Sequence, residues 1–195
     1  MATAALPESL PAAFSYTAAR RSGLSDRRLR DLRSDGLIQA LSRGLYLRQD
    51  APPADLDLLE IAARAPEATL CLRSALSRHD LIDDIPPEID LALPRGRRHP
   101  KTAAPARWHT FDPQTFLIGR DTLELAGSLS IGLYSPERCL IDAFRLRHQE
   151  GPELAHQALK AWLRRRDAQP ATLLRMAKDF PKAEPALRLA LEILL

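Results

Sequence analysis

The chain has 195 residues, of which 45% are hydrophobic and 27% are charged, a balance typical of folded globular proteins. This length suits one large domain or two small ones. No apolar run approaches the roughly 20 residues that span a bilayer, and the first residues lack the basic and apolar regions of a signal peptide. We therefore expect a cytoplasmic protein that has no membrane partner.

Two cysteines, Cys71 and Cys139, each lie inside an apolar run. Such a position is typical of a reduced thiol that packs as a small hydrophobic side chain in a cytoplasmic protein. A disulfide between the two cysteines is the alternative that remains open.

The net charge of +3 hides an uneven distribution along the chain. Residues 12–48 contain eight arginines and three acidic residues, whereas residues 51–93 contain nine acidic residues and three arginines. Residues 94–111 contain five basic residues and no acidic one. The chain thus has two basic segments separated by an acidic one, a pattern that favours a polyanion as partner.

The sequence of residues 15–36 predicts two short helices joined by a turn. Ser15 can cap a helix that runs to Arg21, and Gly23 ends this helix in a left-handed conformation. Ser25 is a good cap for the next helix, which ends at Gly36. Two helices joined by a turn that contains glycine are typical of a helix-turn-helix.

The second of these helices has an apolar side and a basic side. At about 100° per residue, Leu29 and Leu32 lie about 60° apart and define the side that packs on the core. The polar residues opposite or beside these leucines are Arg27, Arg28, Arg30, Asp31, Arg33 and Ser34. The helix is therefore expected to be anchored by two leucines and to present arginines to its surroundings.

Residues 37–47 predict a β-hairpin. Two short apolar runs, 37–41 and 45–47, are separated by a tight turn in which Gly44 supplies the unusual backbone angle. A hairpin directly after a helix-turn-helix is a wing, so the order of elements predicts a winged helix-turn-helix. Arg43 would lie at the tip of this wing, beside a phosphate or in a minor groove.

A basic helix face by itself is most often a solvated surface. Here the glycine turn, the capped helix, the arginines opposite leucines and the basic hairpin tip occur together, and this combination favours double-stranded DNA. Phosphates attract arginines regardless of sequence, whereas a guanine edge accepts a bidentate guanidinium, worth about 1–3 kcal/mol of discrimination. The alternative is a winged-helix module for protein–protein contact in which the basic face is inert.

Nine residues are the candidates for DNA contact. We expect Arg27, Arg30 and Ser34 to face the major groove. We expect Arg28, Arg33 and Arg43 to hold phosphates. From the preceding helix, Tyr16, Arg20 and Arg21 are expected to touch the DNA backbone.

The stretch YTAARRSGLSDRRLRDLRSDGLIQALSRGLYLR, residues 16–48, resembles the N-terminal winged-helix domain of AbiEi-type antitoxins. The closest part is the hairpin GLIQALSRGLYLR, which has an apolar strand, a basic-glycine turn and then Leu-Tyr-Leu. This resemblance implies a transcriptional repressor that regulates its own toxin–antitoxin operon.

The remaining chain predicts an α+β domain after a linker at residues 50–53. Helices are expected at 56–65, 69–83, 136–150, 152–166, 170–180 and 183–195, and strands at 89–93, 107–112, 114–120 and twice within 121–136. We therefore predict an α+β fold class: a winged helix-turn-helix at 1–50, then a domain at 54–195 with a small, mostly antiparallel sheet and a helical C-terminus.

Three segments of this second domain resemble AbiEi-type antitoxins more specifically. They are LCLRSALSRHDLID (70–83), PPEIDLALPRGRRHP (86–100) and LYSPERCLIDAFRLR (133–147). The resemblance implies that the domain supports autoregulation and counteracts a nucleotidyltransferase-like toxin, either by direct contact or only functionally.

No sequence pattern indicates an enzyme. Glu88 and Asp90 share one face of a predicted strand, but the acidic-x-Lys strand of a nuclease is missing, so we expect edge or loop-facing carboxylates. The five histidines show no ligand spacing and lie apart from the cysteines, so we expect no metal or cofactor. Ser74 and Ser77 lie close to His79 without the glycines of a nucleophile elbow, and no glycine-rich phosphate loop occurs.

The second basic segment, at 94–108, has two interpretations. One is an exposed loop between strands; the other is a second phosphate-contacting patch, or the surface that meets an acidic partner. The patch would consist of Arg95, Arg97, Arg98 and Lys101. Aromatic residues are sparse there, so stacking of single-stranded bases is poorly supported.

Overall fold

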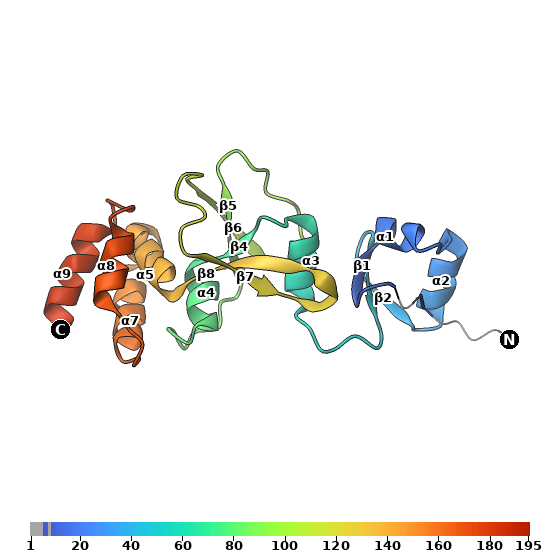
Figure 1. Cartoon of the computed structure of the whole chain (residues 1–195), viewed down its shortest axis with the longest axis horizontal. Helices are drawn as coiled ribbons and strands as arrows, with labels where there is room; N and C mark the ends of the chain where they lie inside the picture. The colour runs from blue at the N-terminus through green and yellow to red at the C-terminus, as the bar shows by residue number, and fades with distance from the viewer. Residues whose placement is uncertain (1–5, 8) are drawn as a thin grey trace. The chain divides into compact units, whose positions relative to one another are not determined.

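The computed structural model describes residues 6, 7 and 9–195 of the chain. They form a mixed α+β fold, in which a small antiparallel sheet with two helices is followed by a larger mixed sheet and a helical C-terminal part (Figure 1). The predicted fold class is confirmed, with a correction to the pairing in the larger sheet.

The N-terminal part contains the predicted helix-turn-helix and hairpin. Its elements are β1 (Ala13–Ser15), α1 (Tyr16–Arg21), α2 (Asp26–Ser34), β2 (Ile38–Ser42) and β3 (Leu45–Arg48). The strands form an antiparallel sheet in the order β1-β3-β2. β1 is an addition to the predicted elements: three residues are too few to show a periodic pattern, and pairing with β3 is what makes them a strand.

A small hydrophobic core holds this part together. The buried side chains of Leu29 and Leu32 on α2 pack with Phe14, Leu24 and Ile38. These residues come from α2, the turn before it and two strands of the sheet, so the core fixes the position of α2 against the hairpin. Full burial of a leucine contributes about 1.5–3 kcal/mol.

The larger sheet has the strand order β6-β5-β4-β8-β7. Its strands are β4 (Thr69–Leu70), β5 (Ile89–Pro94), β6 (Ala106–Phe111), β7 (Arg120–Glu124) and β8 (Ser130–Tyr134), with a short 3-10 helix, η1 (Ala126–Ser128), between the last two. β4 pairs antiparallel with β5. However, β4 pairs parallel with β8, and β5 pairs parallel with β6. The sheet is thus mixed rather than mostly antiparallel.

The parallel pair arises because the chain doubles back before β6 begins. After β5 it turns at Gly96 and returns along 97–105, so that the Ile89 amide donates to the Pro105 carbonyl at the start of both strands. Parallel strands require such a return segment, whereas antiparallel strands need only a tight turn.

The strand predicted at 114–120 is wrong: residues 113–119 form turns, and β7 begins at Arg120. The Gln114 amide donates to the Asp112 side chain, which bends the chain at once. The carbonyls of Thr115 and Ile118 accept hydrogen bonds from the buried Arg138 side chain, each at 2.6 Å. These carbonyls are therefore satisfied by a side chain from α5 rather than by a neighbouring strand.

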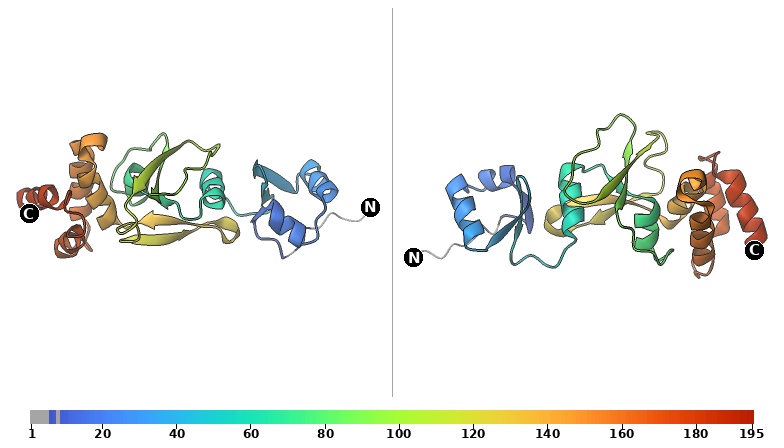
Figure 2. Two further views of the ribbon diagram at one scale, coloured as in Figure 1. Left: turned by 90° about the horizontal axis from the view of Figure 1, so that it is seen from above. Right: turned by 180° about the vertical axis from the view of Figure 1, so that it is seen from behind.

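Helices make up most of the rest of the chain. They are α3 (Leu56–Arg64), α4 (Leu72–Arg78), α5 (Pro136–Arg145), α6 (Arg147–Glu150), α7 (Pro152–Leu163), α8 (Pro170–Ala177) and α9 (Glu184–Leu194). Each lies within a predicted helix, although the segment predicted at 69–83 begins with β4. α4 contacts β5 of the larger sheet. α5 contacts α7, α8 and α9, which Figure 2 shows as a group in orange and red.

The chain divides into two compact units. The first contains residues 1–67, 100–104 and 123–131, and the second contains 68–99, 105–122 and 132–195. The first unit extends beyond the linker at 50–53 because α3 contacts β2 and η1 contacts β1.

Cys71 and Cys139 are both buried and free, as predicted for reduced thiols, and burial raises the pKa of each. In the described part of the chain, no helix is long and apolar enough to cross a membrane.

Candidate nucleic-acid interface

Two serine caps and a glycine turn fix the helix-turn-helix. The Ser15 hydroxyl accepts from the Ala18 amide at 3.1 Å, and the Ser25 hydroxyl accepts from the Arg28 amide at 3.2 Å. Between the helices, Gly23 has a φ of +84°, a conformation that favours glycine. The local sequence therefore specifies where each helix begins and where the chain turns.

The predicted faces of α2 are present. Leu29 and Leu32 are buried, and Arg27 and Arg30 are exposed on the other side. Arg28 is half-buried, as is typical of a long side chain whose stem can pack while its charged end reaches solvent. The apolar side thus holds the helix in place and leaves the basic side accessible.

The tip of the hairpin is attached to the start of α1. Arg43 and Gly44 connect β2 to β3, and Gly44 has a φ of +79°. The Gly44 carbonyl accepts from the Tyr16 amide at 2.7 Å. This bond holds the turn in place while the Arg43 side chain remains exposed.

The arginines of the first fifty residues fall into two groups. Arg20 and Arg48 bond to neighbouring protein groups, the latter to both carboxylate oxygens of Asp50. The arginine side chains that make no hydrogen bond or ion pair with any described residue are Arg21, Arg27, Arg28, Arg30, Arg33 and Arg43. All six belong to the predicted DNA-binding set, so α1, α2 and the hairpin tip carry guanidinium groups that no described residue pairs with.

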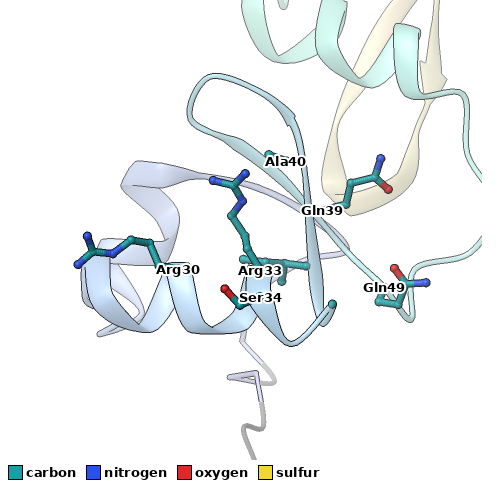
Figure 3. Close-up of a pocket in the computed structure, with 8 residues that line it drawn as sticks. Arg30, Arg33, Ser34, Gln39, Ala40 and Gln49 are labelled. Atoms are coloured by element: carbon teal, nitrogen blue, oxygen red, sulfur yellow. The ribbon is translucent and has the colours of Figure 1, made fainter.

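A hollow of about 660 Å³ lies between α2 and the hairpin. Its lining residues are Arg30, Arg33, Ser34, Gly36, Ile38, Gln39, Ala40 and Gln49. In Figure 3, Arg33 reaches from α2 towards the strand that carries Ala40, whereas Arg30 points away from the hairpin. The two arginines therefore offer guanidinium groups in different directions from one helix.

The sequence pattern did not indicate Gln39 and Gln49 as candidates for DNA contact. Both are exposed and belong to the lining of the hollow, and in Figure 3 their amide groups point away from α2. The signal that identifies Gln39 is the strand pattern, because it follows the buried Ile38 on β2. A glutamine amide can donate to and accept from an adenine edge at once.

Tyr16 and Arg20 stabilise the helix pair through their polar groups. The Tyr16 hydroxyl donates to the Asp26 carboxylate at 2.7 Å, and this bond raises the pKa of Tyr16. Arg20 donates to the Leu24 carbonyl at 3.0 Å and lies 3.8 Å from Asp26. The two side chains thus connect α1 to the turn and to the first residue of α2.

The residues of the second basic patch divide between the two compact units. Arg95, Arg97 and Arg98 are exposed on the turn that follows β5, in the second unit. Lys101 is exposed in segment 100–104, which belongs to the first unit.

Asp90 is not the edge or loop-facing carboxylate that its sequence context predicts. It is buried on an interior strand, with Glu88 exposed beside it. Its carboxylate accepts from Arg107 at 2.6 Å and bonds to His109 at 2.9 Å. Burial alone raises the pKa of Asp90, but the hydrogen bonds from His109 and Arg107 outweigh it and the pKa is lowered. The described residues contain no cluster of three or more potential metal ligands.

The chain shares its fold with a solved structure, that of the RV2827C protein from Mycobacterium tuberculosis. The likeness has a TM-score of 0.61 and covers 93% of this chain and 72% of the other, at 19% sequence identity. At this identity the likeness concerns the fold alone. No protein-family model and no curated protein sequence matches the chain.

Proposed function

We propose that the protein is a sequence-specific repressor that binds double-stranded DNA through α2 and the hairpin. The observation that carries this proposal is the set of exposed arginines that have no partner among the described residues, including Arg27, Arg30 and Arg43. A cation that is not paired within the protein gains more from a phosphate or a guanine edge than one that must first break an ion pair.

Two different contacts are proposed for this surface. Arg27, Arg30 and Ser34 face base edges in the major groove, where bidentate bonds give sequence preference. Arg28, Arg33 and Arg43 hold phosphates, which supply affinity without sequence preference. Gln39 and Gln49 join the first group as candidates for adenine recognition, because both line the hollow beside α2.

We further propose that the repressor is an antitoxin of the AbiEi type, which autoregulates its own promoter and counteracts a nucleotidyltransferase-like toxin. The three segments at 70–83, 86–100 and 133–147 support this role through their resemblance to that family. Co-expression with the product of the adjacent reading frame tests the role: rescue of toxin-arrested growth is expected, and continued arrest would contradict it.

Arg30→Ala and Arg43→Ala separate base reading from phosphate binding. Removal of a bidentate guanine interaction costs about 1–3 kcal/mol, so Arg30→Ala should weaken binding to the protein's own upstream region and relax base preference. Arg43→Ala should weaken all duplexes alike and reduce the salt slope by about 1. Gel-shift titrations against the upstream duplex and a scrambled duplex at several salt concentrations measure both effects.

The double variant Arg27→Ala/Arg30→Ala decides between DNA binding and a protein-contact module. If α2 reads the DNA sequence, this variant should lose most of its preference for the upstream duplex in the same titration. Unchanged affinity would exclude α2 as the reading helix and favour the protein-contact module. Arg164→Ala/Arg166→Ala is the matched control, because both arginines are exposed in the second unit.

A further inference from the structure

The turn after β5 concentrates positive charge on the second unit. Arg95, Arg97 and Arg98 are all exposed and lie within four consecutive residues. Arg95 lies 3.8 Å from Asp112, but the two side chains are 71% and 48% exposed, so solvent weakens this pair. The Arg98 side chain makes no hydrogen bond or ion pair with the rest of the described chain.

These arginines lie on an ordered turn. The Arg97 amide donates to the Pro94 carbonyl at 3.1 Å, and Gly96 between them has a φ of +93°. The Arg95 amide donates to the Phe111 carbonyl at 2.8 Å, which continues the ladder between β5 and β6. The backbone that carries the charges is therefore already fixed, and a ligand does not have to order it.

A second contact holds the segment where it leaves the turn. The His99 ring stacks on Trp108 of β6, with ring centroids 5.7 Å apart and planes within 19°. The same ring lies within hydrogen-bond distance, 3.2 Å, of the Thr110 hydroxyl. Trp108 and Thr110 alternate on β6 with Arg107 and His109, whose side chains bond to the buried Asp90 on the other face.

We propose that Arg95, Arg97 and Arg98 form a second binding surface for the phosphate backbone of double-stranded DNA, on the unit that does not contain α2. The choice of DNA as ligand rests on the proposed function. Guanidinium groups on a rigid turn suit phosphate oxygens, which accept paired N–H bonds. The surface has exposed cations and few aromatic side chains, so it holds the backbone and does not read bases.

The salt dependence of binding tests this surface in the full chain. For B-DNA, the slope of log K against log salt changes by about 0.9 for each phosphate that the protein ceases to neutralise. Arg95→Ala/Arg98→Ala should therefore flatten the slope by about 2, and the loss of affinity should be equal for upstream and scrambled duplexes and largest at low salt. Arg164→Ala/Arg166→Ala removes the same charge elsewhere on this unit and should leave the slope unchanged.

Each outcome decides the proposal independently of the role of α2. An unchanged slope in Arg95→Ala/Arg98→Ala overturns the second surface, even if Arg27→Ala/Arg30→Ala abolishes sequence preference and so upholds the repressor. An equal decrease in the control also overturns it, because net charge alone then accounts for the effect. Poly-glutamate of matched charge should compete weakly; competition as strong as that of duplex DNA would instead identify an acidic protein partner and overturn the proposal.

Discussion

The arginines of this chain have two kinds of role, and their partners distinguish them. Arg138 is buried, pairs with Asp142 and donates to backbone carbonyls, so its charge is balanced within the fold. Arg27 and Arg30 have the same side chain but remain exposed, without a partner in the described part of the chain. The amino-acid composition does not distinguish these two kinds of arginine, but only the exposed, unpaired arginines can bind an external anion.

Asp90 provides a residue-scale prediction on stability. Its lowered pKa means that it stabilises the fold above about pH 4, the ordinary range of its pKa, and that this stabilisation is lost as the pH falls through the folded pKa. We expect Asp90→Asn to cost about 2 kcal/mol at pH 7, less than a fully buried pair because Arg107 is 40% exposed.

Urea unfolding of the wild type and Asp90→Asn at pH 7, 4 and 3 measures this contribution. The difference between the two proteins should narrow as the pH falls below about 4, because Asp90 then takes up a proton in the unfolded state before it does so in the folded state. A constant difference across this range would contradict the role of the Asp90 charge.

At the scale of elements, α2 is defined by its ends as much as by its faces. The Ser25 hydroxyl satisfies the Arg28 amide, Asp26 lies in the first turn and Gly36 follows the helix. An aspartate near a helix N-terminus is favourable because it complements the helix dipole. These local interactions explain why a helix of nine residues, too short to be stable alone, begins at a fixed residue.

Removal of the cap tests this explanation. Ser25→Ala should destabilise the first unit by about 1 kcal/mol, since the Arg28 amide is then left without its acceptor. Hydrogen exchange of the α2 amides measures the effect, and Ser25→Asp, which can also accept, is the control expected to retain protection. Equal exchange in Ser25→Ala and the wild type would show that packing alone sets the start of α2.

At the scale of the whole molecule, the first unit is completed by chain that comes much later. Segments 100–104 and 123–131 belong to it. The Glu60 carboxylate of α3 accepts from the Ala103 and Ala104 amides at 2.9 and 3.1 Å. The backbone of Gly127 approaches Ala13 so closely that no side chain fits between them. The unit therefore depends on residues outside the helix-turn-helix and hairpin.

A fragment of residues 1–50 should accordingly fold less stably than the same residues in the full chain. It keeps the core around Leu29 and Leu32 but lacks the packing of η1 on β1 and of α3 on β2. We expect the fragment to be less stable because the apolar surface that these elements cover becomes exposed to water. Hydrogen exchange of the Arg48 amide, which donates to Ala12, measures the difference; equal protection in fragment and full chain would contradict the expectation.

The predictability of the fold differed between elements for a physical reason. α1, α2 and the hairpin are specified by nearby caps, glycines and apolar spacing, so their sequence predicts them closely. β4 has two residues and shows no pattern, and it is a strand because β5 and β8 lie on either side of it. Residues 114–120 have a strand-like composition, but they form turns in which the Arg138 side chain donates hydrogen bonds to the Thr115 and Ile118 carbonyls.

Local patterns in the sequence predict the α+β class, the two faces of α2 and the position of the glycine turns, because helices, strands and turns depend on residues within a few positions of one another. The three-dimensional fold is needed to know which arginines have no partner among the described residues, that Gln39 and Gln49 line the hollow, and that Asp90 is buried among basic side chains. Those properties depend on distances between residues far apart in the chain, which local patterns do not encode.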